Sequence, residues 1–234
     1  MILQQVDLFR LILLFAFQGA VSLFFYYLGI KLLKRNLNRM SLILSSFYIV
    51  TGSGLLISVI YLPFRESLIG FIIYFIAAFL IPFGAIFLVL FIINLLYFDS
   101  KFSIKFQIAY MFIYGIFLFL ILNIPEGIKI SQETQWNPLY SWVFIMVFYF
   151  FFAASIIMPT IFFLLRLHNK FEDNKLKRKL RYFIIGISGM FITFYGLILY
   201  NSAINPIFKI IWIGLSFIVI PSGYLIYYGI GRAL

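Results

Sequence analysis

The fold is decided by the most basic stretch of the chain, Leu165-Arg-Leu-His-Asn-Lys-Phe-Glu-Asp-Asn-Lys-Leu-Lys-Arg-Lys-Leu-Arg181. It holds seven of the chain's 18 basic residues, and only Glu172 and Asp173 oppose them. It separates two long apolar segments of a chain that is 65% hydrophobic. Because basic loops of membrane proteins stay on the cytoplasmic side, this predicted loop sets the direction of every neighbouring helix.

The composition excludes an ordinary soluble domain. Charged residues make up 11% of the 234 residues, whereas a soluble domain carries roughly 25%. The net charge of +11 comes from basic residues placed between apolar segments, which is typical of membrane orientation and not of nucleic-acid binding. We therefore predict an all-α, polytopic membrane protein with one domain over residues 1–234 and no nucleic-acid partner.

Seven stretches have the roughly 20 mostly apolar residues that a spanning helix needs. The predicted helices cover residues 8–33, 40–62, 67–98, 104–124, 139–167, 180–200 and 206–230. Fourteen basic residues then fall on one side of the bilayer, and four fall on the other. This asymmetry predicts an N-terminus outside and a C-terminus in the cytoplasm, in the cell membrane. The first ten residues lack a basic region, so we expect no cleaved signal peptide.

The residues that carry most enzyme and metal chemistry are scarce. The chain has no cysteine and one histidine, His168, which cannot supply the three or four ligands of a typical metal site. No Asp or Glu lies inside a predicted helix, and intramembrane carboxylates are the usual carriers of protons and coupled cations. We expect no enzymatic activity, no cofactor and no metal, and we disfavour ion-coupled transport.

Polar side chains inside the predicted helices suggest one candidate ligand site. Gln18 lies near the middle of the first helix, where a buried amide must find a hydrogen-bond partner. One interpretation is a polar cavity lined by Gln18, Tyr48, Thr51 and Tyr195. The alternative is that these side chains join helices, with Gly52 and Gly54 allowing close packing.

Three prolines inside predicted helices are candidate hinges. Pro82, Pro159 and Pro221 each remove one hydrogen bond from a spanning helix. Bends at the last two would let the cytoplasmic ends of their helices swing, as a signalling switch requires. Static kinks that improve packing are the alternative interpretation.

The basic stretch is the second candidate site. Its basic residues are Arg166, Lys170, Lys175, Lys177, Arg178, Lys179 and Arg181. They would bind a cytoplasmic partner or anionic lipid, and each such residue near the bilayer surface adds roughly 1 kcal/mol of attraction. Membrane orientation combined with lipid anchoring is the simpler interpretation.

The basic stretch runs into Arg178-Lys-Leu-Arg-Tyr-Phe-Ile-Ile-Gly186. The last predicted helix contains Trp212-Ile-Gly-Leu215 and Gly223-Tyr-Leu-Ile-Tyr-Tyr-Gly-Ile-Gly-Arg232. These patterns, with the topology, resemble the seven-helix sensor region at the N-terminus of some prokaryotic histidine kinases. In that family the seventh helix continues into a kinase, whereas this sequence ends at Leu234. The resemblance therefore implies a stand-alone sensor that passes its signal to another protein.

We predict a receptor-like or sensory integral membrane protein without enzymatic activity. A small apolar or amphiphilic ligand, or the bilayer itself, would change helix packing, and the basic stretch would transmit the change to a cytoplasmic or membrane partner. An uncoupled transporter or channel is one alternative, and it predicts a continuous wet path through the bundle. A structural subunit of a larger complex is another, and it predicts a wide apolar lateral face. A homo-oligomer is left open.

Overall fold

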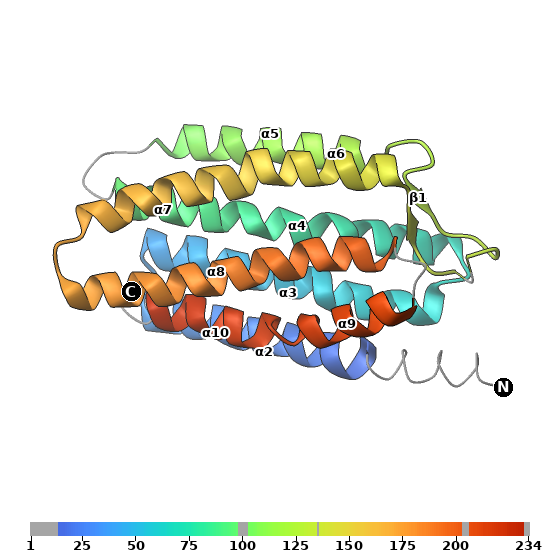
Figure 1. The fold of residues 1–234 in the computed structure, drawn as a ribbon, viewed down its shortest axis with the longest axis horizontal. Helices are drawn as coiled ribbons and strands as arrows, with labels where there is room; N and C mark the ends of the chain where they lie inside the picture. The colour runs from blue at the N-terminus through green and yellow to red at the C-terminus, as the bar shows by residue number, and fades with distance from the viewer. Residues whose placement is uncertain (1–13, 98–102, 135, 203–205, 232–234) are drawn as a thin grey trace.

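The computed structural model describes residues 14–97, 103–134, 136–202 and 206–231 (Figure 1). Nearly parallel helices form an elongated bundle. The helices are η1 (Leu14–Gln18, π-helical), α2 (Gly19–Arg35), α3 (Arg39–Phe64), α4 (Leu68–Leu96), α5 (Ile104–Leu122), α6 (Trp142–Phe152), η2 (Ala153–Ile157, π-helical), α7 (Met158–Lys170), α8 (Asn174–Tyr200), α9 (Pro206–Ser216) and α10 (Val219–Gly229). Strands β1 (Ile128–Lys129) and β2 (Leu139–Tyr140) pair antiparallel in a short hairpin at one end.

Seven helical stretches of the described chain are long and apolar enough to cross a membrane. They are Ala16–Arg35, Arg39–Phe64, Leu68–Leu96, Ile104–Leu122, Trp142–Lys170, Asn174–Tyr200 and Ile211–Gly229. This confirms the predicted all-α class and the multi-pass membrane protein. Of the first predicted helix, residues 8–13 lie outside the described part of the chain.

The bundle has two different ends, which we name here (Figure 1). The hairpin end carries β1 and β2, and the basic end carries the α2–α3 and α7–α8 connections. Side-chain caps begin several helices at these ends. Asn38 Oδ1 accepts from Ser41 N at 2.7 Å to begin α3, and Asp173 Oδ1 accepts from Lys175 N at 2.8 Å to begin α8.

The basic stretch is not the long loop that we predicted. α7 continues to Lys170 and α8 begins at Asn174, so only residues 171–173 connect the two helices. Lysine, arginine and leucine are good helix formers, and no Gly or Pro interrupts them. The sixth predicted helix, residues 180–200, therefore begins six residues earlier, and its basic residues form the first two turns of α8.

The fifth and seventh predicted helices are each interrupted before a proline. Pro159 follows the π-helical turn η2, and Pro221 follows a turn at Phe217 and Ile218 that separates α9 from α10. Proline lacks a backbone N–H and clashes with the carbonyl four residues earlier, which is Ser155 in one case and Phe217 in the other. Pro82 differs, because α4 continues through it without interruption.

Glycines let two pairs of helix backbones approach closely. A Cβ built on Gly186 would lie 2.7 Å from the Ser222 carbonyl oxygen, so α8 and α10 meet there without a side chain between them. A Cβ on Gly54 would lie 2.9 Å from the backbone nitrogen of Ile81, which places α3 equally close to α4. Small residues are the usual means of close helix packing inside a bilayer.

Aromatic side chains fill the half of the bundle toward the basic end. Phe25, Phe47 and Tyr48 are fully buried and pack as a cluster, with ring centroids 4.9 to 6.1 Å apart. Phe91 and Phe183 extend the packing, with centroids at 5.6 Å. The core of this half is therefore closed by packed aromatic rings.

Candidate ligand cavity

Two adjoining cavities lie in the half of the bundle toward the hairpin. The central chamber has a volume of about 120 Å³ and lies between η1, α3, α8 and α9. The hairpin chamber has a volume of about 130 Å³ and lies between α3, α4, α6 and α8 beneath the hairpin. Five residues line both chambers: Gln18, Ile81, Phe194, Leu197 and Tyr200. For scale, an engineered apolar cavity of about 150 Å³ holds a benzene molecule.

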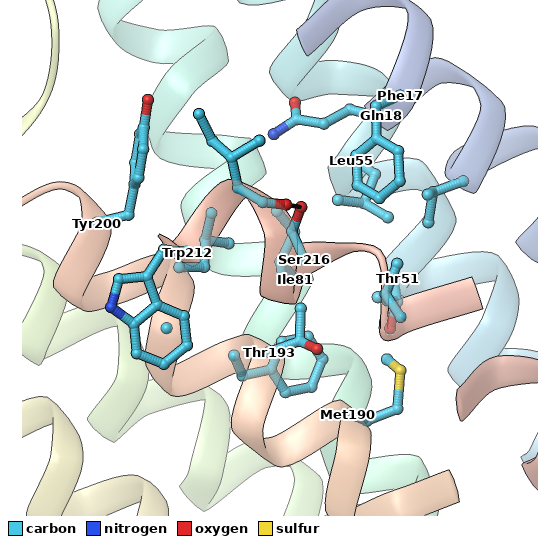
Figure 2. A pocket seen from close by; sticks show the side chains of 16 residues that line it. Phe17, Gln18, Thr51, Leu55, Ile81, Met190, Thr193, Tyr200, Trp212 and Ser216 are labelled. Carbon is cyan, nitrogen blue, oxygen red and sulfur yellow. Dashed lines mark hydrogen bonds between the residues drawn. The ribbon is translucent and has the colours of Figure 1, made fainter. Parts of the chain in front are cut away.

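The walls of the central chamber are almost entirely apolar (Figure 2). Two hydroxyls on α8 and α9 bond within their own helices. Thr193 Oγ1 donates to the Gly189 carbonyl at 2.9 Å, and Ser216 Oγ donates to the Ile213 carbonyl at 2.7 Å. Such local bonds satisfy a hydroxyl inside the bilayer, so these two side chains do not require a ligand.

Gln18 is the polar side chain placed best to bind a ligand. It lies between the chambers, at the last residue of the π-helical turn η1, and Figure 2 shows its side chain extending into the cavity. Its Oε1 accepts a hydrogen bond from Ser58 Oγ at 2.9 Å. Ser58 Oγ also lies 2.7 Å from the Leu55 carbonyl, and its single proton is shared between the two contacts, so the Gln18 amide keeps hydrogen-bonding capacity toward the cavity. Isolated π-helical turns are frequent at functional sites.

Thr51 lines the central chamber but presents little polarity to it. Its side chain is 1% exposed, and its Oγ1 has no hydrogen-bond partner among the described residues. The oxygen packs against Gly84, because a Cβ built on that glycine would lie only 2.1 Å away. Thr51 therefore contributes shape to the wall and close packing between α3 and α4.

Tyr48 and Tyr195 do not line either chamber. The Tyr48 hydroxyl donates to the Gly223 carbonyl at 2.8 Å, which joins α3 to α10. Tyr195 and Tyr149 each donate from the hydroxyl to the other's carbonyl, at 3.0 and 2.6 Å. Of the four side chains predicted to share one cavity, the structure brings together Gln18 and Thr51 and places both tyrosines in bonds between helices.

Tyrosines that were not predicted as site residues hold the hairpin over its chamber. The Tyr61 hydroxyl donates to the Trp136 carbonyl at 2.5 Å, and the hydroxyls of Tyr74 and Tyr140 share a hydrogen bond. The backbone nitrogen of Tyr140 donates to the Asn201 carbonyl at 3.3 Å. Burial raises the pKa of Tyr140, so its hydroxyl stays protonated at neutral pH. The hairpin is thereby tied to α3, α4 and the end of α8.

The two chambers carry no charge on the residues that the structure describes. No Lys, Arg, His, Asp or Glu is among the residues that line them. The described part of the chain also contains no group of three His, Cys, Asp or Glu side chains that would hold a metal ion. The site is therefore suited to binding an uncharged molecule by shape and a few hydrogen bonds.

The second candidate site lies at the basic end, and two of its seven predicted residues make contacts within the protein. Lys170 Nζ donates to the Leu96 carbonyl at 3.2 Å, at the end of α4. The Arg166 guanidinium lies 4.2 Å from the centre of the Phe162 ring, a cation–π contact. The other five lie on the first turns of α8: Lys175, Lys177, Arg178, Lys179 and Arg181.

Those five basic residues make up most of the first two turns of α8. Lys175, Arg178 and Arg181 are exposed, whereas Leu180 on the opposite face is buried against the bundle. A shallow open groove runs along the exposed face from Asn174 to Arg181. The arrangement offers several guanidinium and ammonium groups to an anionic surface.

The three candidate hinges occupy different surroundings. Pro82 is buried and lines the hairpin chamber, and its carbonyl accepts from the Tyr114 hydroxyl at 3.0 Å. Pro221 is exposed on the outside of the bundle, one turn after the interruption that borders the central chamber. Pro159 lies away from both chambers, after η2. Movement at any of them remains a prediction.

Comparison with known proteins gives no match: no family model, no curated protein and no solved structure is similar to this chain. The resemblance to kinase sensor regions therefore rests on the two sequence patterns alone. The chambers and the charge pattern are the observations from which a function can be argued.

Proposed function

We propose that this chain is a receptor-like sensor that binds a small apolar or amphiphilic molecule in the two chambers and signals through its basic end. The observation that carries the proposal is the pair of adjoining chambers, lined largely by apolar side chains and bordered by the amide of Gln18. Ligand pockets in proteins are typically apolar with a few placed polar groups. Interrupted helices beside a cavity are also typical of binding sites in membrane proteins.

The proposed orientation places the basic end in the cytoplasm and the hairpin outside. Of the basic side chains that the structure describes, twelve lie toward the basic end, and Arg65 and Lys129 lie toward the hairpin end. Positive charge is retained on the cytoplasmic side of membrane proteins. The chambers would then lie in the outer half of the bilayer, reachable by a molecule from outside or from the outer leaflet.

The proposed path of the signal is α8. Its second half lines both chambers through Met190, Thr193 and Tyr200, and its first half carries Lys175 to Arg181. A ligand that changes the packing around α8 would shift the basic residues relative to a partner or to anionic lipid. The exposed groove at the start of α8 is the surface offered for that contact.

An uncoupled transporter is the alternative function, and the closed aromatic cluster bears on it. Between the chambers and the basic end lie Phe25, Phe47 and Tyr48, all fully buried. A transporter would have to open this packed layer to complete a wet path, whereas a sensor would leave it closed. Flux of a small solute into liposomes that contain the protein separates the two functions.

The proposal is tested by native mass spectrometry of the protein released gently from its own membranes. Val219 is buried and lines the central chamber, so Val219→Phe would fill part of the cavity. Val147, 39% exposed on α6, provides the matched control Val147→Phe. We expect a small molecule to stay bound to the unmodified protein and to Val147→Phe but not to Val219→Phe. A protein that carries only bulk lipid would refute the ligand-binding proposal.

The signalling half of the proposal has its own experiment. Replacing Lys175, Lys177, Arg178 and Lys179 by glutamine removes four charges from the exposed start of α8. We expect recovery of a membrane or cytoplasmic partner from solubilised membranes to be lost. Unchanged recovery of that partner would show that this surface only orients the protein or contacts lipid.

A further inference from the structure

We infer that the ligand of the two chambers is an uncharged, single-chain amphiphile whose head forms a hydrogen bond with the Gln18 amide. Its alkyl chain would lie in the central chamber, and its head would lie at the junction with the hairpin chamber. The inference rests on the proposed function, in that it names the class of molecule which the same chambers bind.

The absence of charge is the first argument, because it restricts the head group. No Lys, Arg, His, Asp or Glu lines either chamber within the described chain. A carboxylate, phosphate or ammonium group enclosed there would lose its hydration and gain no opposite charge. A head that is uncharged, such as an alcohol, ester, amide or ketone, loses far less on entering.

The hydrogen-bonding capacity of Gln18 is the second argument, because it requires a polar head. Gln18 Oε1 lies 2.9 Å from Ser58 Oγ, and the single proton of that hydroxyl is shared with a 2.7 Å contact to the Leu55 carbonyl. The amide nitrogen makes no bond within the described residues, so the Gln18 amide keeps hydrogen-bonding capacity toward the chambers. The group that binds there must therefore form a hydrogen bond, which an alkane cannot do and a haloalkane does poorly.

The direction of the molecule follows from the unequal polarity of the chambers. The central chamber is walled by Phe17, Leu55 and Trp212, and the Thr193 and Ser216 hydroxyls in its wall bond within their own helices. The hairpin chamber adds Ser58, Asn137 and Asn201. An alkyl chain therefore fits the central chamber, and a polar head fits the side toward the hairpin.

The volumes limit the size of the molecule. Each chamber is close to an engineered cavity that holds the six carbon atoms of benzene. Together they accommodate about ten non-hydrogen atoms, which corresponds to a medium-length chain and excludes a two-chain phospholipid. Such a chain partitions readily into a bilayer and can reach the site from the lipid.

The experiment uses bromine as a contact quencher of Trp212, which lines the central chamber. Trp136→Phe and Trp142→Phe leave Trp212 as the single tryptophan of the chain. The full-length protein in lipid nanodiscs is titrated at about pH 8 with 8-bromo-1-octanol, 8-bromooctanoate and 1-bromooctane, which share one chain and differ in the head. Concentrations are expressed per bilayer lipid, so that unequal partitioning is removed.

We expect saturable quenching of Trp212 by 8-bromo-1-octanol and an affinity at least about tenfold lower for both other compounds, since one kept hydrogen bond is worth about that factor. Gln18→Met keeps the length of the side chain and removes the hydrogen-bonding amide. It should weaken 8-bromo-1-octanol about tenfold and leave 1-bromooctane unchanged. The control Gln132→Met changes an exposed glutamine of the hairpin and should have no effect on either compound.

The outcomes separate the inference from the proposed function. If no compound quenches Trp212 saturably, the chambers do not bind such chains, and both proposals fall. If 8-bromooctanoate binds as tightly as the alcohol, the uncharged head is refuted while the proposed function stands. If 1-bromooctane binds as tightly as the alcohol, the role of Gln18 as a hydrogen-bond partner of the head is refuted. This comparison needs no variant at Gln18, so it holds even if Gln18→Met fails to fold.

Discussion

The Tyr110 hydroxyl on α5 donates a hydrogen bond of 2.5 Å to the carbonyl oxygen of Ser155 in η2. Ser155 lies four residues before Pro159, which has no N–H to offer to that carbonyl. A side chain of one helix thus donates to a backbone carbonyl of another helix, next to a proline that has no N–H. Inside a bilayer no water is present to do so, and an unsatisfied carbonyl is costly.

This relationship predicts a measurable loss of stability. Tyr110→Phe should lower the free energy of unfolding in detergent micelles by about 1–2 kcal/mol, because the Ser155 carbonyl loses its donor. Tyr224→Phe is the control, since Tyr224 is 49% exposed and its hydroxyl makes no hydrogen bond within the described chain. In a Pro159→Ala background the cost of Tyr110→Phe should shrink. An equal cost in both backgrounds would contradict the explanation.

Two glycine-to-alanine changes should differ in their effect on stability, because only Gly186 lies at the close contact of α8 with α10. Gly186→Ala should destabilise the protein by about 1–3 kcal/mol, because its Cβ would overlap the Ser222 carbonyl and the Ile226 backbone. Gly214 lies in helix α9 with no atom within 4 Å of a built Cβ, so Gly214→Ala should be neutral or slightly stabilising. Thermal unfolding of both variants gives the comparison, and equal melting temperatures would refute it.

The hairpin should open when its tyrosine contact is removed. Tyr140→Phe breaks the hydrogen bond with Tyr74, so we expect hydrogen exchange of residues 128–140 to accelerate about tenfold, the equivalent of one net hydrogen bond. Tyr74→Phe should have the same effect, and the double variant should add little to either one. Full additivity of the two substitutions would show that they act independently and not through one bond.

The absence of cysteine makes the proposed orientation directly measurable. Single variants Arg178→Cys and Gln132→Cys place one thiol at the basic end and one on the hairpin. In intact cells a membrane-impermeant maleimide should label Gln132→Cys only, and Arg178→Cys should react only after the cells are opened. The reverse pattern would invert the topology and place the chambers in the inner half of the bilayer.

The seven helices were predictable because the thickness of a bilayer imposes a length of apolar chain that is easily counted. The start of α8 was not predictable, because hydropathy identifies apolar residues and does not show whether the polar residues beside them are helical. Lys175 to Arg181 continue the helix beyond the apolar part, and Asp173 begins it. The interruption at Phe217 followed from Pro221, but a proline does not determine whether its helix bends or breaks, as the uninterrupted α4 around Pro82 demonstrates.

The cavity was predictable only in part. Gln18 and Thr51 could be selected as polar residues of adjacent spans, and both line the central chamber. Tyr48 and Tyr195 could not be excluded, because the rotation of a helix and the carbonyl that a hydroxyl reaches depend on packing between distant segments. The same holds for Tyr140 of β2, whose place in the wall of the hairpin chamber depends on contacts with Tyr74 and Asn201.

The unbroken length of α8 gives the molecule a mechanical property. No proline interrupts the helix between Thr193 at the central chamber and Lys175 at the basic end, so it can act as a stiff lever. The eighteen residues between them span about 27 Å, and a tilt of about 5° around the chamber would displace Lys175 by about 2 Å. A bound molecule of about ten non-hydrogen atoms would therefore need to displace its neighbours only slightly to shift all the basic residues at the other end of α8.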